Sequence, residues 1–284
     1  MIKLIATDLD GTLFYPKRRI ALMTRKNKRF LIDYHKAGGE IVLVTGRSLR
    51  ISKKVDKKLG FHIPLIGCGG SFIYQNGEFI QSHPIDRETM MDLFITFRRE
   101  LGIIGWIIFD ETDIIKIAPT NMGKLLSLGA VIVNGFLGAY REKYYISESE
   151  FIKTISTKNI YKVMPAFGLS EGAKRKAQAA RIAMMDKFGD KLTINVTSMM
   201  LEITAEEANK ADTLKDYIKM KGIKEDEVAV VGDSYNDISM FEAFENSFGM
   251  KSGENCIRKR AKHLIDRVSD MREYSLTEEG KLKK

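Results

Sequence analysis

The sequence predicts an α/β protein built on a doubly wound parallel sheet, with an α+β domain inserted in its middle. Two observations lead to this fold class. Strand-length apolar runs alternate with helix-length amphipathic segments at both ends of the chain, and between these regions the pattern changes to several short strands with fewer helices. The expected boundaries are a discontinuous core at residues 1–81 and 200–284 and an inserted domain at residues 82–199.

The first part of the core has the signals of three strands, two helices and a hairpin. We predict strands at residues 2–6, 41–44 and 65–66, helices at 24–36 and 48–59, and a hairpin from 72–74 to 78–80. The hairpin is expected because its two runs flank Asn76-Gly77, a dipeptide strongly favoured in tight turns between strands. Repeated alternation of strand and helix implies a parallel, doubly wound sheet.

The middle of the chain mixes short strands and helices. We expect helices at residues 90–101 and 171–188 and strands at 105–109, 114–118, 144–146, 161–167, 192–196 and 201–204. The alternation of strands and helices seen in the first 81 residues then returns, with helices at 212–220, 236–244 and 254–261 and strands at 228–231, 247–249 and 263–265. The natural inference is a core that a second domain interrupts.

Composition excludes several classes of protein. The chain has 284 residues, of which 44% are hydrophobic, and this predicts a packed globular protein. The longest apolar stretches, such as residues 128–137, are shorter than the roughly 18 residues of a membrane-spanning helix. Met1 leads directly into a strand, which leaves no room for a signal peptide, and neither Cys68 nor Cys256 belongs to a paired motif. We therefore expect a cytoplasmic protein with reduced thiols and no membrane partner.

The net charge of +9 makes a nucleic-acid partner a hypothesis to weigh. Basic residues exceed acidic residues by 3 in residues 82–199 and by 6 in the rest of the chain, so the positive charge is not concentrated in one region. The densest basic run, Lys174-Arg175-Lys176, lies in a predicted helix and is typical of a solvated face. We expect no nucleic-acid partner, although a mild positive field would help to recruit small anionic substrates.

The first candidate for a functional site is the segment Asp8-Leu9-Asp10-Gly11-Thr12-Leu13, which follows the first predicted strand. Open parallel sheets bind ligands beyond the carboxyl ends of their strands, and strand residues i and i+2 point to the same side. Asp8 and Asp10 could therefore share a metal ion and a substrate. A simple Asp-Gly turn and a solvated acidic loop are competing interpretations. An EF-hand calcium loop is excluded, because glycine stands fourth, at Gly11, and the twelfth residue is Arg19.

Two other strand ends in the core carry polar motifs. Thr45-Gly46-Arg47 offers a hydroxyl and a backbone amide that an anion can approach at the start of a helix. Gly232-Asp233-Ser234-Tyr235-Asn236-Asp237 carries acids at i and i+4, which would face each other. Taken alone, this second motif is explained equally well as a helix cap. Together with Asp8 and Asp10, it provides the oxygen-rich, incompletely filled shell that Mg²⁺ prefers.

Lys210 completes a candidate site. It stands at the start of the helix predicted at residues 212–220, which runs opposite to the following strand and so begins near the carboxyl end of that strand. Lys210 would then lie near Asp233, although a lone lysine is usually a solvated surface group. A hydroxyl, a cation, backbone amides and Mg²⁺ around a carboxylate nucleophile make a phosphoryl-transfer site.

These four motifs, in their order and spacing, resemble those of the haloacid dehalogenase superfamily, specifically the Cof-type phosphatases with a large α/β cap. The resemblance covers essentially the whole chain and implies a Rossmann-like core, Mg²⁺ as cofactor and an aspartyl-phosphate intermediate. It implies the following roles: Asp8 as nucleophile and Asp10 as general acid and base; Thr45, Gly46 and Lys210 as phosphate ligands; Asp8, the carbonyl of Asp10, and Asp233 as metal ligands; and Asn236 and Asp237 in support.

The chain departs from the Cof-type pattern at two places. Gly69-Gly70 stands where these proteins often have Asn-Gly, a change that removes a polar side chain near the cap entrance. Asn209-Lys210-Ala211 replaces the usual Ser-Lys-Gly, a change that keeps the cation. The resemblance therefore supports the reaction more firmly than it supports any one substrate.

The leading hypothesis is Mg²⁺-dependent hydrolysis of small phosphomonoesters, with sugar phosphates as the expected class. A phosphosugar mutase of the same superfamily and a non-catalytic phosphometabolite sensor are the alternatives. The expected partner is a small phosphorylated metabolite, and the expected assembly is a monomer or a small homo-oligomer. Trp106, Tyr144 and Tyr145 could line a sugar site, but aromatic residues at strand spacing more often belong to a core.

Overall fold

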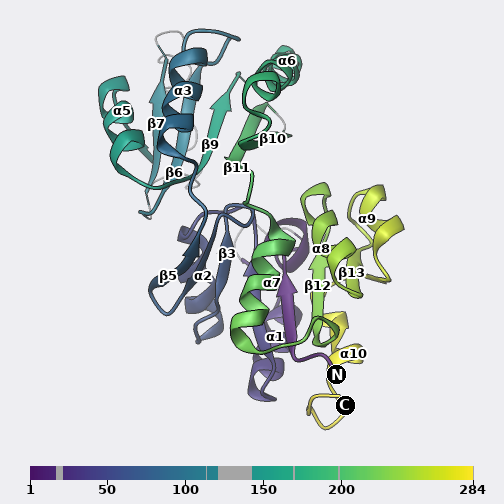
Figure 1. Ribbon diagram of the computed structural model, residues 1–284. Coiled ribbons are helices and arrows are strands. Elements are labelled where there is room, and N and C mark those ends of the chain that lie inside the picture. Colours follow the sequence, from purple (N-terminus) through teal and green to yellow (C-terminus); the bar gives the residue numbers. More distant parts are fainter. Residues whose placement is uncertain (17–21, 113, 121–142, 169, 198, 284) are drawn as a thin grey trace. The chain divides into compact units, whose positions relative to one another are not determined.

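A computed structural model describes residues 1–284 apart from 17–21, 113, 121–142, 169, 198 and 284. The chain divides into two compact units, Met1–Ser82 with Ala208–Lys284, and His83–Glu207, so the second is inserted into the sequence of the first (Figure 1). The apolar stretch at residues 128–137 lies outside the described residues. Within the described part of the chain, no helix has the length and apolar character needed to cross a membrane.

The first unit is built on an eight-stranded sheet. Its strands lie in the order β14 (His263–Ile265), β13 (Asn246–Met250), β12 (Val228–Gly232), β1 (Leu4–Thr7), β2 (Glu40–Val44), β3 (Leu65–Gly67), β4 (Phe72–Gln75) and β5 (Glu78–Ser82). The strands from β14 to β3 are parallel, and β4 and β5 add an antiparallel hairpin. The hairpin turns at Asn76 and Gly77, whose φ angles of 53° and 94° match the left-handed turn predicted there.

Helices cover both faces of this sheet. They are α1 (Arg25–Lys36), α2 (Arg50–Leu59), α7 (Lys210–Lys221), α8 (Ile238–Ala243), α9 (Asn255–Arg260) and α10 (Arg272–Ser275), with short turns η1 (Leu9–Leu13), η2 (Glu225–Glu227), η3 (Tyr235–Asp237) and η4 (Val268–Met271). One hydrophobic core joins α7, α8 and α9 to alternate strand residues such as Leu4, Ala6 and Val230. On the opposite face, α1 packs on β2 beside α2 and α10.

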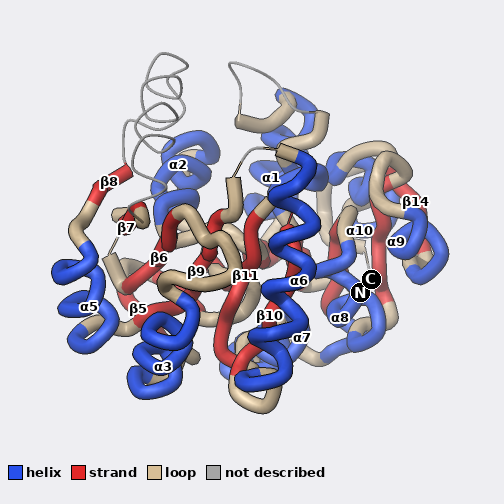
Figure 2. The backbone as a smooth tube through the Cα atoms, turned by 90° about the horizontal axis from the view of Figure 1, so that it is seen from above, coloured by secondary structure: helices blue, strands red, loops and turns tan. Residues whose placement is uncertain are grey.

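In its described residues, the second unit is a six-stranded sheet with helices packed against it. Its strands lie in the order β10 (Leu192–Thr197), β11 (Met200–Ala205), β9 (Ile160–Ala166), β6 (Gly105–Asp110), β7 (Ile115–Pro119) and β8 (Lys143–Tyr145). Neighbouring strands are antiparallel except β7 and β8. The helices α3 (Arg87–Phe97), α5 (Glu148–Thr157) and α6 (Glu171–Phe188) lie along one side of the sheet (Figure 2). Trp106 packs in this core against Phe94 and Phe151, so it is a core residue, whereas Tyr145 is exposed.

The predicted fold class is confirmed, with two differences in detail. Helix α5 is not among the predicted elements, although the Ser147 hydroxyl caps it by accepting a hydrogen bond from the N–H of Glu150 at 3.2 Å. The second unit extends to Glu207 rather than to Met199, because β11 pairs with β9 and β10.

Candidate active site

Asp8 lies at the carboxyl edge of the core sheet, directly after β1. Its backbone N–H donates to the carbonyl of Val231 on β12 at 2.9 Å, which continues the pairing of β1 by one residue. The side chain is therefore fixed at the ends of the central strands, and the residue is only 4% exposed. The sheet thus presents a buried carboxylate where open parallel sheets bind ligands.

Lys210 is the counter-ion of this carboxylate. It opens α7, whose first turn is capped by the side chain of Asn209, an acceptor for the N–H of Ala211 at 2.8 Å. The Nζ atom of Lys210 donates to Asp8 Oδ1 at 2.9 Å and to Asp237 Oδ1 at 2.7 Å. Because Lys210 is 2% exposed, its ammonium group is buried between two carboxylates.

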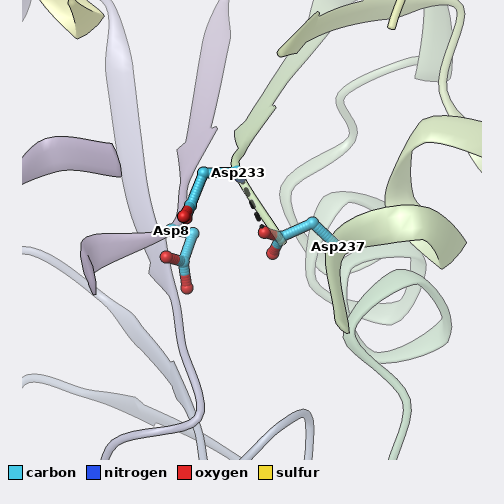
Figure 3. A group of neighbouring side chains, drawn as sticks. All are labelled: Asp8, Asp233 and Asp237. Carbon is cyan, nitrogen blue, oxygen red and sulfur yellow. Dashed lines mark hydrogen bonds between the residues drawn. The ribbon is translucent and has the colours of Figure 1, made fainter. Parts of the chain in front are cut away.

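Asp237 joins the loop after β12 to Lys210. Its second oxygen, Oδ2, accepts a hydrogen bond from the backbone N–H of Asp233 at 3.0 Å (Figure 3). The same oxygen accepts from the backbone N–H of Ser234 at 3.1 Å. Asn236 lies beside it, where its Oδ1 accepts from Lys210 Nζ at 3.4 Å and from the Ser234 hydroxyl at 2.8 Å. The loop and the lysine therefore hold each other in place.

Asp233 brings a third carboxylate to the site. Its Oδ1 accepts a hydrogen bond from the hydroxyl of Thr12 at 2.8 Å. Gly11 permits this close approach, because its φ is +78° and a Cβ there would lie 2.1 Å from Asp233 Oδ2. One carboxylate oxygen from each of Asp8, Asp233 and Asp237 lies within 4.8 Å of the others (Figure 3).

Burial dominates the electrostatics of this cluster. It raises the pKa of Asp8 to about 8, against the opposing charge of Lys210, and it raises the pKa of Asp233 to about 6. Burial disfavours the charged form of Lys210, but Asp237 and Asp8 together outweigh it and raise the pKa of the lysine. Three acidic side chains thus surround one ammonium group, which is hydrogen-bonded to two of them, so the ionised cluster is short of positive charge.

The donor set fits a divalent metal ion. Both oxygens of Asp237 accept hydrogen bonds, whereas Oδ2 of Asp8 and Oδ2 of Asp233 accept none from the residues that the structure describes. Carboxylate oxygens with an excess of negative charge are the hard ligands that Mg²⁺ prefers. Asp8 and Asp233 are therefore suited to hold the metal, and Asp237 is suited to orient Lys210.

Asp10, Thr45 and Gly46 lie on the loops that follow β1 and β2. The Asp10 side chain is 59% exposed and accepts two hydrogen bonds from the guanidinium of Arg47, at 2.5 and 2.6 Å. Thr45 is 1% exposed, and its hydroxyl accepts from the N–H of Arg47 at 3.2 Å. Gly46 stands between Thr45 and Arg47 and is half-buried. Arg47 thus connects the predicted phosphate ligands to the predicted acid and base.

The orientation of Asp10 is set by a turn rather than by strand alternation. Strand β1 ends at Thr7, before both aspartates. The chain then changes direction within η1, at Asp10 (φ −78°, ψ 123°) and Gly11 (φ 78°, ψ −14°). Asp8 is buried and Asp10 is largely exposed as a result. The predicted relation between the two residues, based on i and i+2 sharing a strand face, therefore does not describe this loop.

The two departures from the Cof-type pattern have structural explanations. A Cβ at Gly70 (φ +109°) would lie 2.5 Å from the backbone carbonyl carbon of Asn209, so glycine lets this loop pack on the start of α7. The Thr213 hydroxyl strengthens the contact by donating to the carbonyl of Gly70 at 2.7 Å. At Gly69 (φ +77°) a Cβ would meet no atom within 4 Å, and its N–H donates to the carbonyl of Thr45 at 2.9 Å. Asn209 supplies the helix cap that serine would otherwise provide.

Two contacts in the site were not predicted. Thr12 belongs to the first polar motif, and its hydroxyl binds Asp233. Arg47 belongs to the second polar motif, and its guanidinium binds Asp10. The only available signal was that both residues lie within polar motifs after core strands. The turns of these loops decide which side chains meet, and residue spacing does not specify those turns.

Comparisons with known proteins agree on one family. A family model described as haloacid dehalogenase-like hydrolase matches residues 5–271. Phosphatase YwpJ of Bacillus subtilis is 24% identical over 269 residues, which cover 92% of this chain and 93% of that protein. The crystal structure of a haloacid dehalogenase-like hydrolase from Bacteroides thetaiotaomicron matches with a TM-score of 0.77 at 20% identity, over 96% of this chain and 99% of that one. The structure of a subclass IIB sugar phosphatase matches with a TM-score of 0.71 at 21% identity, over 96% and 98% of the two chains.

Proposed function

The chain belongs to the haloacid dehalogenase-like hydrolase family, and we propose that it is a Mg²⁺-dependent phosphatase that hydrolyses small phosphomonoesters through an aspartyl-phosphate. One observation carries the proposal: Asp8 is buried at the sheet edge, bonded to Lys210 and close to the carboxylates of Asp233 and Asp237. A carboxylate that is oriented and shielded from water in this way is suited to act as a nucleophile toward phosphorus.

The proposed reaction has two steps. An oxygen of Asp8 forms a bond to phosphorus while the bond from phosphorus to the ester oxygen breaks, and Asp10 in its acid form gives a proton to that oxygen, so the product leaves as an alcohol. Water then attacks phosphorus and gives a proton to Asp10, while the bond between Asp8 and phosphorus breaks. Inorganic phosphate leaves, and both side chains return to their starting states.

The phosphoryl group would be held by residues from separate strand ends. Thr45 supplies a hydroxyl, Gly46 a backbone N–H, and Lys210 an ammonium group whose charge Asp8 and Asp237 maintain. Asp8, Asp233 and the carbonyl of Asp10 would hold Mg²⁺, whose charge offsets that of the phosphoryl oxygens. Asn236 and Asp237 would keep Lys210 in place through the hydrogen bonds described above.

We assign the unit His83–Glu207 the role of a cap that excludes water and contacts the leaving group. Sugar phosphates are the proposed substrate class, a choice supported by the similar solved structure of a sugar phosphatase. The net charge of +9 also favours small anionic substrates.

A panel of phosphorylated metabolites tests the proposal. Purified protein is incubated with each compound in Mg²⁺ or in EDTA, and both inorganic phosphate and the organic product are measured. We expect phosphate release from one or more sugar phosphates that requires Mg²⁺. Isomerised sugar phosphate without net phosphate release would identify a mutase instead. Absence of turnover across the panel and on p-nitrophenyl phosphate would contradict an enzymatic role and favour a sensor.

A further inference from the structure

Arg47 forms a bidentate hydrogen-bonded contact with the carboxylate of Asp10. Its Nε donates to Asp10 Oδ2 at 2.5 Å and its Nη2 donates to Asp10 Oδ1 at 2.6 Å. This geometry matches the planar fork of arginine to the two oxygens of one carboxylate, and it fixes both the position and the rotation of that group. Asp10 accepts no other hydrogen bond from the residues that the structure describes.

Arg47 is itself held from several sides. Its backbone N–H donates to the hydroxyl of Thr45 at 3.2 Å, and its carbonyl accepts from the N–H of Cys68 at 2.8 Å. Its guanidinium carbon lies 5.6 Å from the centre of the Phe14 ring, within the range of a cation–π contact. The backbone of Arg47 is therefore held by hydrogen bonds, and its guanidinium packs against the nearly buried ring of Phe14. A side chain held in this way can orient its partner.

Stability alone is a weak explanation for this pair. The side chains of Arg47 and Asp10 are 46% and 59% exposed, and exposed ion pairs contribute little to folding. A largely exposed carboxylate would otherwise rotate freely among its side-chain conformers. The chief consequence of the contact is therefore to restrict the orientation of Asp10.

We propose that Arg47 is a positioning residue that aims Asp10 at the oxygen of the leaving group. The proposal rests on the phosphatase function given above. When Asp10 carries a proton, its unprotonated oxygen can keep one hydrogen bond from Arg47, while its O–H donates to the ester oxygen as the bond from phosphorus to that oxygen breaks. When Asp10 is ionised, both hydrogen bonds re-form, and the carboxylate is oriented to accept a proton from water.

Leaving-group dependence tests this role. The ratio kcat/KM reports the steps up to transfer of the phosphoryl group to Asp8 when that transfer is irreversible. An alkyl phosphate needs a proton on its departing oxygen, whereas p-nitrophenolate leaves without one. For Arg47→Met we expect kcat/KM to fall by about tenfold or more with the alkyl ester and by less than about threefold with p-nitrophenyl phosphate, in line with the usual contribution of general acids.

Two further variants separate positioning from phosphate binding. Arg47→Lys keeps the charge but loses the fork, so we expect it to show the same selective loss with the alkyl ester. In an Asp10→Asn background, adding Arg47→Met should cause little further loss, because the group that Arg47 orients no longer transfers a proton. Equal losses with both esters, full recovery by lysine, or additivity with Asp10→Asn would overturn the proposal in favour of direct phosphate binding.

Arg260→Met is the matched control. The Arg260 side chain on α9 is 47% exposed and forms an ion pair with Glu242 on α8 at 3.5 Å, so the change removes a comparable surface contact. We expect this variant to match the wild type with both esters, and circular dichroism to show that all variants are folded. An active wild type with an unaffected Arg47→Met would overturn the positioning role alone. An inactive wild type would overturn the phosphatase function as well.

Discussion

Replacing Lys210 by methionine should destabilise the core in a way that depends on pH. Lys210 donates to Asp8 at 2.9 Å and to Asp237 at 2.7 Å, and the three side chains are between 0% and 6% exposed, so solvent screens these contacts very little. Removing one partner of a buried ion pair typically costs about 3–5 kcal/mol in the free energy of unfolding. We expect a loss of that size at pH 8.

The loss should be smaller at lower pH. Burial already raises the pKa of Asp8 to about 8 in the wild type, and removing the ammonium group raises it further. The folded variant can therefore bind a proton at Asp8 in place of the lost cation. A group whose pKa is raised on folding contributes stability below its unfolded pKa and loses that contribution as the pH rises through the folded pKa. Asp8 keeps its proton up to about pH 8 in the wild type and to a higher pH in the variant, so the difference between the two proteins should be nearly constant from pH 6 to pH 8 and grow above pH 8.

Urea denaturation followed by circular dichroism at pH 6, 7, 8 and 9, in EDTA, measures this effect. Far-ultraviolet signal is required because Trp106, the one tryptophan in the chain, lies in the second unit. Lys251→Met is the control, since it removes an exposed ion pair with Asp266 at 2.8 Å and should leave the free energy of unfolding nearly unchanged at each of these pH values. A Lys210→Met loss that matches this control, or that does not change with pH, would refute the electrostatic account.

Two other predictions follow from the acidic cluster. Gly11→Ala should reduce turnover by about tenfold or more and weaken Mg²⁺ binding, because the added Cβ would meet Asp233. The control Gly60→Ala has a similar φ of +91° and nothing within 4 Å of the added Cβ, so it should lower stability alone. Unchanged Mg²⁺ affinity of Gly11→Ala in titration calorimetry would contradict this prediction. Mg²⁺ binding should tighten from pH 5 to pH 8 and release protons, because burial raises the pKa values of Asp8 and Asp233 to about 8 and about 6; a binding enthalpy that is the same in buffers of different ionisation enthalpy would argue against proton release.

The sequence predicted the fold of the core and the identity of the buried cluster for a common reason. Strands that end in polar residues bring those residues to one edge of a parallel sheet, whatever the details of packing. Asp8 and Asp237 could be found in this way, and so could Lys210, because the helix that it opens precedes β12 and runs antiparallel to it. In the structure these three residues share the hydrogen bonds of one ammonium group.

The orientation of the loops could not be predicted from the same pattern. The exposure of Asp10 depends on the turn at Gly11, and the partner of Arg47 depends on where that turn places Asp10. Helix α5 is a different case, since its start signal, Ser147 followed three residues later by Glu150, is local and present in the sequence. The boundary near Glu207 depended on long-range pairing of β11, which no local pattern reports.

The central claim is that Asp8 forms the bond to phosphorus. Its most direct test is the rate of phosphate release by Asp8→Asn and by the wild type, with Mg²⁺ and the best ester from the metabolite panel. Asparagine has nearly the same shape as aspartate but is a much poorer nucleophile, so we expect a folded variant whose turnover is lost by a factor on the order of a thousand or more. An Asp8→Asn protein that releases phosphate at a rate close to that of the wild type would contradict the account.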